Sequence, residues 1–169
     1  MTELRNLVRL LLSLPDGTVR PANQPAPTGR EPFVTVQRLR TDPLGAETLT
    51  FDGEEERETI HSSYLSTVSI NAFGTEAYEL MLKLRSVLAS SAGIDGMKAI
   101  GGGIVTTGQV IDLTGIVGAG YEERARVELQ ISHTHTVVTD QLRIAEARVD
   151  AHTDTGLSRS VDIIPTEST

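Results

Sequence analysis

The sequence contains no cysteine and no tryptophan, and it has only three phenylalanines and three tyrosines. The absence of cysteine excludes disulfide bonds, thiolate metal sites and cysteine nucleophiles. Because aromatic residues are so few, aliphatic side chains must build any core. A chain of 169 residues has the usual size of one domain and is long enough to bury such a core.

Positive charge is also scarce, since 15 Lys and Arg face 23 Asp and Glu and give a formal net charge of −8. Proteins that bind nucleic acid through its phosphates need clustered Lys and Arg, so this balance argues against that class. The net negative charge is compatible with a protein surface that DNA can pass without binding to it. No apolar run approaches membrane-spanning length, and charged residues interrupt the N-terminal leucines, so we expect neither a signal peptide nor a membrane segment.

Two segments have the apolar spacing of amphipathic helices. Residues 2–14 carry one broad apolar face, and Pro15-Asp16-Gly17 is expected to end this helix. Residues 75–91 carry a single core-facing stripe, and we expect Thr75 to cap this second helix and Gly93 to stop it. The stripe consists of Ala77, Leu80, Met81, Leu84, Val87 and Leu88.

A proline-rich segment, residues 19–32, separates the first helix from the first strand and contains four prolines. The prolines favour extended polyproline-type or irregular structure and keep the segment out of a helix. Composition leaves two interpretations open. The segment is either a surface linker or an ordered arm that contacts a partner, because prolines reduce the entropy lost on binding.

Alternating side chains predict strands over residues 33–39 and 59–73, and a shorter strand over residues 46–51. The Asp52-Gly53 pair predicts a hairpin between the short strand and the long one that follows it. The run Glu54-Glu55-Glu56 is most simply a solvated loop.

The clearest alternation lies in residues 121–138. One face of this strand is apolar and the other is charged, as in an antiparallel sheet with one side in water. Opposite charges two residues apart can pair along the charged face, each pair contributing at most about 1 kcal/mol. The apolar face comprises Tyr121, Ala125, Val127, Leu129 and Ile131, and the charged face comprises Glu122, Arg124, Arg126, Glu128 and Gln130.

Few residues suggest catalysis. Gly101-Gly102-Gly103 lacks the Lys-Ser/Thr of a phosphate-binding loop, which favours a tight turn before a short strand. His133 and His135 lie on the same side of a strand and could ligate zinc, but the third-ligand candidates have no diagnostic spacing. These candidates are His61, His152 and Asp140. The Asp52 turn could supply paired carboxylates, although flexible acidic loops rarely hold catalytic geometry. We predict no enzymatic activity, no cofactor and no metal, and keep a small metal-dependent hydrolase as an alternative.

The predicted elements form a single α+β domain. Its antiparallel or mixed sheet would have four or five strands flanked by the helices of residues 2–14 and 75–91. Residues 142–149 would add a last strand or short helix. We expect this domain to cover residues 1–150, with the proline-rich segment included. Residues 151–169 would form a polar C-terminal tail that is flexible or ordered only against a neighbouring subunit.

Three local motifs, in this order, make the chain resemble a known family. The first is Arg20-Pro21-Ala22-Asn23-Gln24-Pro25-Ala26-Pro27, followed by the strand Phe33-Val34-Thr35-Val36. The second is Val68-Ser69-Ile70-Asn71-Ala72-Phe73-Gly74, which leads into the second helix, and the third is Gly118-Ala119-Gly120-Tyr121-Glu122-Glu123-Arg124-Ala125. From about residue 3 to about residue 150, the chain resembles the phage neck terminator or tail terminator family of long-tailed phages. It departs from that pattern at Glu123, where proline is expected.

The resemblance implies a mechanical role. Such proteins form a ring, commonly six-fold, that caps the head-proximal end of the tail tube, stops its polymerisation and joins the tail to the neck. The ring leaves a channel through which DNA passes without specific binding. The implied partners are further copies of the chain, the tail tube protein, the sheath protein of a contractile tail and the neck or head-completion proteins, with no membrane. The implied location is the virion tail or neck, after assembly in the host cytoplasm.

A closed ring requires heterologous contacts between subunits. The resemblance therefore favours the arm interpretation of the proline-rich segment. We expect the charged face of the last long strand to meet an acidic face of the next subunit, where charge pairs set register more than affinity. The predicted interface residues are Arg20, Asn23, Gln24, Pro25, Arg124 and Arg126. Another virion protein, either a head-completion ring or a tail tube subunit, remains an alternative.

Overall fold

The computed structural model describes residues 1–23, 32–117, 120–142, 147–152, 156 and 158–163. The chain divides into two compact units. The first contains Met1–Glu47 and His61–His135, and the second contains Thr48–Ile60 and Thr136–Thr169. The fold class is α+β, as predicted, with more strands than the four or five expected.

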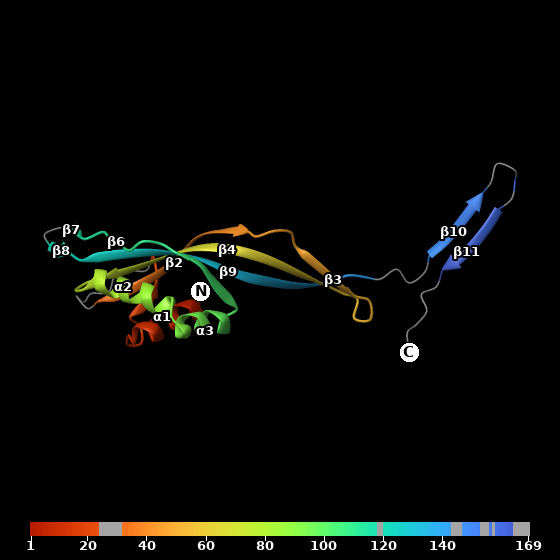
Figure 1. The fold of residues 1–169 in the computed structure, drawn as a ribbon. Coiled ribbons are helices and arrows are strands. Elements are labelled where there is room, and N and C mark those ends of the chain that lie inside the picture. Colours follow the sequence, from red (N-terminus) through yellow and green to blue (C-terminus); the bar gives the residue numbers. More distant parts are fainter. Residues whose placement is uncertain (24–31, 118–119, 143–146, 153–155, 157, 164–169) are drawn as a thin grey trace. The chain divides into compact units, whose positions relative to one another are not determined.

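The main sheet of the described residues has seven strands (Figure 1). Its central path runs in the order β1 (Val19–Pro21), β2 (Phe33–Pro43), β4 (Arg57–Phe73), β9 (Arg124–Asp140) and β5 (Gly102–Thr107). Off this path, β3 (Thr48–Asp52) pairs with β4, and β6 (Ile111–Asp112) pairs with β9. The sheet is mixed, because β1 is parallel to β2 whereas β2 and β4, and β5 and β9, are antiparallel.

Several predicted strands are confirmed with small changes in their ends. The β3–β4 hairpin forms at the Asp52-Gly53 pair, where the Asp52 carboxylate accepts a hydrogen bond from the backbone N–H of Glu54. Of the triple glycine, Gly101 forms the turn, with a φ of 73° that glycine adopts without strain, and Gly102 and Gly103 begin β5. The proline-rich segment contributes a short strand, β1, which the sequence did not predict.

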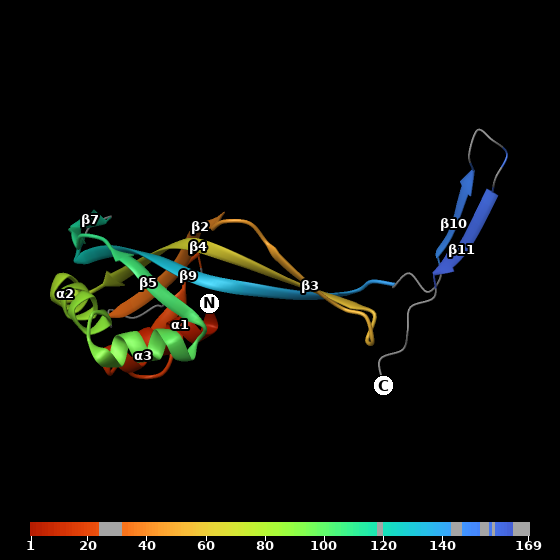
Figure 2. The same cartoon turned by 45° about the vertical axis from the view of Figure 1, so that its right-hand side comes forward.

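Three helices cover one face of the sheet in the first unit: α1 (Thr2–Leu12), α2 (Ala77–Leu88) and α3 (Ser91–Ala99) (Figures 1 and 2). Their apolar stripes pack on alternate residues of the three longest strands, because every second side chain of a strand points to the same face. The core comprises Leu4, Leu7, Val8, Leu12, Val34, Val36, Val68, Ile70, Ala72, Ala77, Met81, Leu84, Leu88, Met97, Ala125, Val127, Leu129 and Ile131.

The predicted helix over residues 75–91 is confirmed for residues 77–88, whereas its expected cap at Thr75 and its expected stop at Gly93 are wrong. The helix α2 starts at Ala77, after Glu76 in a left-handed conformation, and it ends at Leu88. Ser90 then caps α3 by accepting a hydrogen bond from the Gly93 N–H. Gly93 lies inside α3, where an added Cβ would be 2.5 Å from the Val87 carbonyl oxygen. The glycine therefore permits close packing of two helices and does not terminate one.

The predicted strand 121–138 is also divided. Its first residues form β8 (Gly120–Glu122), which pairs with β7 (Gly115–Val117) in a separate two-stranded sheet. Tyr121 is 73% exposed, so its predicted place on the core face is wrong. From Ala125 to Ile131 the prediction is confirmed, because alternate residues of β9 are buried.

The second unit contains strands and no helix among its described residues. It includes β3 and the adjoining ends of β4 and β9, together with the antiparallel hairpin of β10 (Ala147–His152) and β11 (Ser158–Ile163). The strand β11 lies in the segment that the sequence suggested was a polar tail. Every second residue of this strand, at Ser158, Ser160 and Asp162, is polar, and the segment has few apolar residues. The sequence pattern therefore does not distinguish this strand from a loop.

Candidate functional site

The arginines of the predicted interface lie on the sheet face opposite the helices. We call this the polar face and define it by the side chains of Arg20, Thr35, Gln37, Ser69, Asn71, Arg124, Arg126 and Glu128, which alternate with core residues. Arg20 comes from β1, and Arg124 and Arg126 come from β9. Asn23 is exposed two residues beyond β1 and has a positive φ of 64°. Gln24 and Pro25 lie outside the described residues.

Two arginines and two phenylalanines form a row across four strands at one end of this face. The Phe33 and Phe73 rings stack with centroids 4.6 Å apart and an interplanar angle of 7°. The guanidinium of Arg124 lies 4.9 Å from the Phe73 centroid, and that of Arg20 lies 5.7 Å from the Phe33 centroid. These distances fall within the range of cation–π contact. We call this arrangement the Arg–Phe row.

Strand register explains how residues so distant in sequence meet. Phe33 and Phe73 are directly paired at the ends of β2 and β4, and Arg20 is paired with Thr35 one position further along the same face. Sequence reasoning placed Arg20 and Arg124 on an interface but gave no role to the phenylalanines. The available signal was that two of only three phenylalanines begin and end predicted strands.

Arg124 has further partners that hold it against its own sheet. Its guanidinium donates a hydrogen bond to Asn71 Oδ1 at 3.2 Å, and its backbone N–H donates to Thr114 Oγ1. Arg126 forms an ion pair with Glu128 at 3.4 Å, which confirms the predicted pairing along the charged face of the strand. The Nε atoms of both arginines are buried without a hydrogen-bond partner among the described residues. Arg124 is thus a structural residue of the sheet, whereas Arg126 is held less firmly.

Glu123, the departure from the expected family pattern, connects the sheet to the start of α2. Its backbone carbonyl accepts a hydrogen bond from the Gly74 N–H at 2.9 Å, and its carboxylate accepts one from the Glu76 N–H at 2.8 Å. A carboxylate at a helix N-terminus satisfies a backbone donor that the helix itself leaves unpaired. Proline at this position would keep the carbonyl contact and lose the carboxylate contact.

The β7–β8 hairpin presents apolar side chains to solvent. Ile116 and Tyr121 are cross-strand neighbours and are 82% and 73% exposed. These two side chains therefore form a small apolar surface that is open to solvent. The sequence did not predict this patch, because Tyr121 was assigned to the core.

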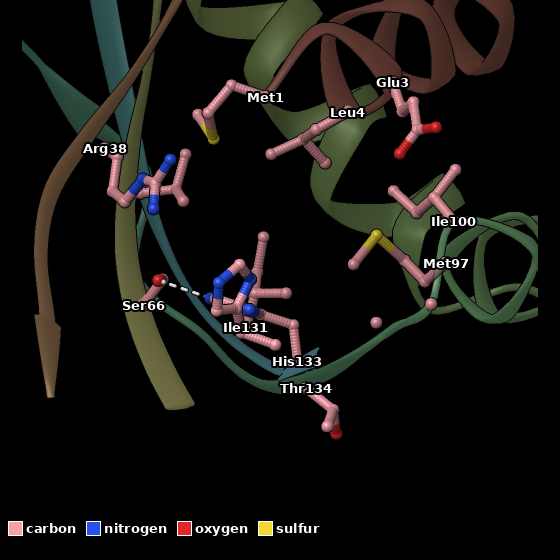
Figure 3. A pocket seen from close by; sticks show the side chains of 14 residues that line it. Met1, Glu3, Leu4, Arg38, Ser66, Met97, Ile100, Ile131, His133 and Thr134 are labelled. Atoms are coloured by element: carbon pink, nitrogen blue, oxygen red, sulfur yellow. Dashed lines mark hydrogen bonds between the residues drawn. The ribbon is translucent and has the colours of Figure 1, made fainter. Parts of the chain in front are cut away.

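The two histidines considered as metal ligands lie at a pocket beside the helices (Figure 3). The pocket has a volume of about 360 Å³ and is lined by Leu4, Met97 and Ile131 on its apolar side and by Arg38, Ser66 and both histidines on its polar side. Ser66 Oγ lies 2.9 Å from His133 Nε2 and 2.8 Å from Thr41 Oγ1. Burial lowers the pKa of His133 below its usual 6.5, and the charge of Arg38 lowers it further.

The described residues around this pocket do not supply a set of metal ligands. Among the described residues, no group of three His, Cys, Asp or Glu side chains could hold a metal ion. The Ser66 hydroxyl is shared between Thr41 and His133, which is the arrangement of a satisfied polar network. Within the described part of the chain, every helix is too short or too polar to cross a membrane.

Residues 1–156 match the model of a family described as phage neck terminator protein. The chain belongs to this family. The match extends the resemblance of residues 3–150 to nearly the whole chain. No curated protein matches the sequence significantly.

As a member of the phage neck terminator family, the protein is a structural component of the phage virion neck and associates with other neck and tail proteins. The three motifs of the resemblance meet at one place in the fold. Arg20 and the following Phe33 come from the first motif, Phe73 ends the second, and Arg124 lies in the third. The Arg–Phe row is therefore the point where the motifs of this neck terminator converge.

Proposed function

We propose that the protein forms a ring, most simply of six copies, that caps the head-proximal end of the tail tube. The ring stops polymerisation of tube subunits, and of sheath in a contractile tail, and joins the tail to the neck. The observation that carries this proposal is the family match over residues 1–156. A formal net charge of −8 supports a channel wall that repels DNA phosphates and lets DNA pass without specific binding.

The proposed subunit contacts include the arginines of the polar face. Arg20, Asn23, Gln24, Pro25, Arg124 and Arg126 remain the interface proposed for a neighbouring copy. Within this set, Arg126 is the strongest candidate, because its side chain is 36% exposed and its one described ion pair, with Glu128, lies on the surface. The exposed Ile116 and Tyr121 suit an apolar contact with the tube or neck protein.

Antibody-gold electron microscopy on intact particles and on separated tails tests the location. We expect label at the head-proximal tail end in both samples. Label along the whole tube would identify a tube subunit instead, and label retained only on heads after separation would identify a head-completion protein.

The stop function is tested with purified tube protein of the same phage. Tubes grown with the protein present should be shorter and carry a ring at one end in negative-stain images. Tubes of unchanged length without a terminal ring would refute the capping role.

A further inference from the structure

The described residues of the second unit form regular strands without a buried side chain. Among the described residues, every buried side chain belongs to the first unit. The second unit instead exposes large apolar side chains: Leu49, Phe51, Val138 and Leu142 are 60%, 48%, 57% and 80% exposed. Strand ribbons and hairpins without a buried face are at most marginally stable in water. Burial of these exposed apolar side chains against another surface would therefore be favourable.

The turn that joins β3 to β4 adds negative charge next to these apolar side chains. Residues 52–58 contain five carboxylates and one arginine. The Asp52 carboxylate accepts hydrogen bonds from the backbone N–H groups of Glu54 and Glu55, at 2.9 and 3.2 Å, and thereby fixes the turn. Glu55 pairs with Arg57, and Glu54 is exposed. The second unit thus presents Leu49 and Phe51 on one face of β3, followed at once by an ordered acidic turn.

The polar face of the first unit offers the complementary combination. At its β6–β9 edge, Ile111 is paired with Arg126 in the strand register and is 44% exposed. Arg126 is joined on the same strand by Arg124, and Glu128 balances only one of these charges. Each of the two surfaces carries an exposed apolar side chain beside charged groups. The charges are of opposite sign, arginines on one surface and carboxylates on the other, so the surfaces are complementary.

We propose that residues 48–58 of one copy dock on the polar face of a second copy, beside Ile111 and Arg126. This inference rests on the proposed ring and names the two surfaces that would build it. The contact is heterologous, because it joins different surfaces of identical chains, and such contacts generate closed rings. Two acidic turns repel each other, which disfavours a symmetric contact between two second units.

The absence of cysteine from the chain permits a test that reports only contacts between copies. Glu54→Cys and Arg126→Cys are made as separate single variants, mixed, and treated with a short bismaleimide cross-linker. Each chain then carries one thiol, so a mixed product links two chains. The control mixture pairs Glu54→Cys with Arg85→Cys, whose position is exposed on α2. We expect the first mixture to give about tenfold more mixed dimer, because docking raises the effective concentration of the two thiols.

Charge reversal provides the second arm. Glu54→Lys with Glu55→Lys should weaken self-association about tenfold, since like charges then face each other. Adding Arg126→Glu should restore most of the loss. Glu79→Lys, on the exposed face of α2, removes the same kind of charge and should leave association unchanged. Sedimentation velocity measures all four proteins, and circular dichroism confirms that each is folded.

The two proposals fail in different ways. Both cross-linking mixtures are assayed free in solution and on capped tubes. Equal yields in both mixtures under both conditions would overturn the docking inference, and so would association that ignores the charge reversals. If the tubes are still capped in that case, the proposed capping function is retained and only the docking inference is rejected. Selective cross-linking without any capping of tubes would support the interface and refute the capping role.

Discussion

Replacing Phe73 with leucine should destabilise the first unit by removing the centre of the Arg–Phe row. Leucine preserves most of the apolar body of the side chain but cannot stack on Phe33 or receive Arg124. A stacked aromatic pair contributes about 1 kcal/mol beyond burial, and a partly exposed cation–π contact contributes about 1 kcal/mol. The expected loss is therefore about 2 kcal/mol, which for a chain of this size lowers Tm by about 4–8 °C.

A double-mutant cycle isolates the ring stacking from the other effects. Phe33→Leu and Phe73→Leu are measured singly and together, and the stacked pair predicts a coupling energy of about 1 kcal/mol. Urea denaturation followed by the helical circular dichroism signal reports the first unit, because all helices of the described residues lie there. The protein must be dilute, since self-association would stabilise the folded state of every variant.

The third phenylalanine supplies a matched control. Phe51 lies on β3 and stacks on no aromatic ring among the described residues. Phe51→Leu in dilute protein should change the free energy of unfolding by less than about 0.5 kcal/mol. Additive effects of the Phe33 and Phe73 substitutions, or a loss at Phe73 no larger than at Phe51, would refute the stabilising role assigned to the row.

Three further predictions concern the packing and polar contacts of the first unit. Gly93→Ala should destabilise by about 1–2 kcal/mol in urea, because its Cβ meets backbone atoms of Val87 and Leu88, whereas Gly96→Ala meets only side-chain atoms of the core residue Leu7 and should cost less. Equal effects of the two would contradict the close helix contact. Since burial lowers the pKa of His133 in the folded state, the unfolded chain takes up the proton first, and Tm should fall as the pH drops below about 6.5. A Tm profile that His133→Gln leaves unchanged would count against this. Glu123→Gln should cost about 0.5–1 kcal/mol by weakening the charged contact with the α2 N-terminus, and no loss in urea would show that contact to be unimportant.

Elements with a strong local pattern could be predicted from the sequence. The alternation in Ala125, Val127, Leu129 and Ile131 shows which side of β9 is buried, because period-two alternation directly reports a half-buried strand. The same holds for the apolar stripe of α2. Helix ends were less predictable, because Gly93 could mark either a left-handed stop or a close approach, and only the neighbouring helix distinguishes these roles.

The candidate site was predictable only in part, because its geometry depends on register between distant segments. The sequence placed Arg20 and Arg124 on a polar surface, but the stacking that joins them passes through Phe33 and Phe73. Direct pairing of these two phenylalanines follows from the β2–β4 register, which no local pattern specifies. The exposed Tyr121 was missed for a related reason, since the apolar alternation continues across a change of sheet at Glu123.

The Arg–Phe row and the exposed apolar side chains of the second unit together suggest a separation between folding and assembly within one chain. The row uses Arg20 and Arg124 to hold four strands of the first unit, so these two arginines already have intramolecular partners before any neighbour binds. Among the described residues, Arg126 has one ion pair, which lies at the surface, and Leu49, Phe51, Val138 and Leu142 of the second unit are exposed. Substitutions at Arg124 should therefore reduce the stability of the free subunit as well as any interface. Substitutions at Arg126 and Glu54 should affect association alone, which makes these two positions the cleaner probes of the ring.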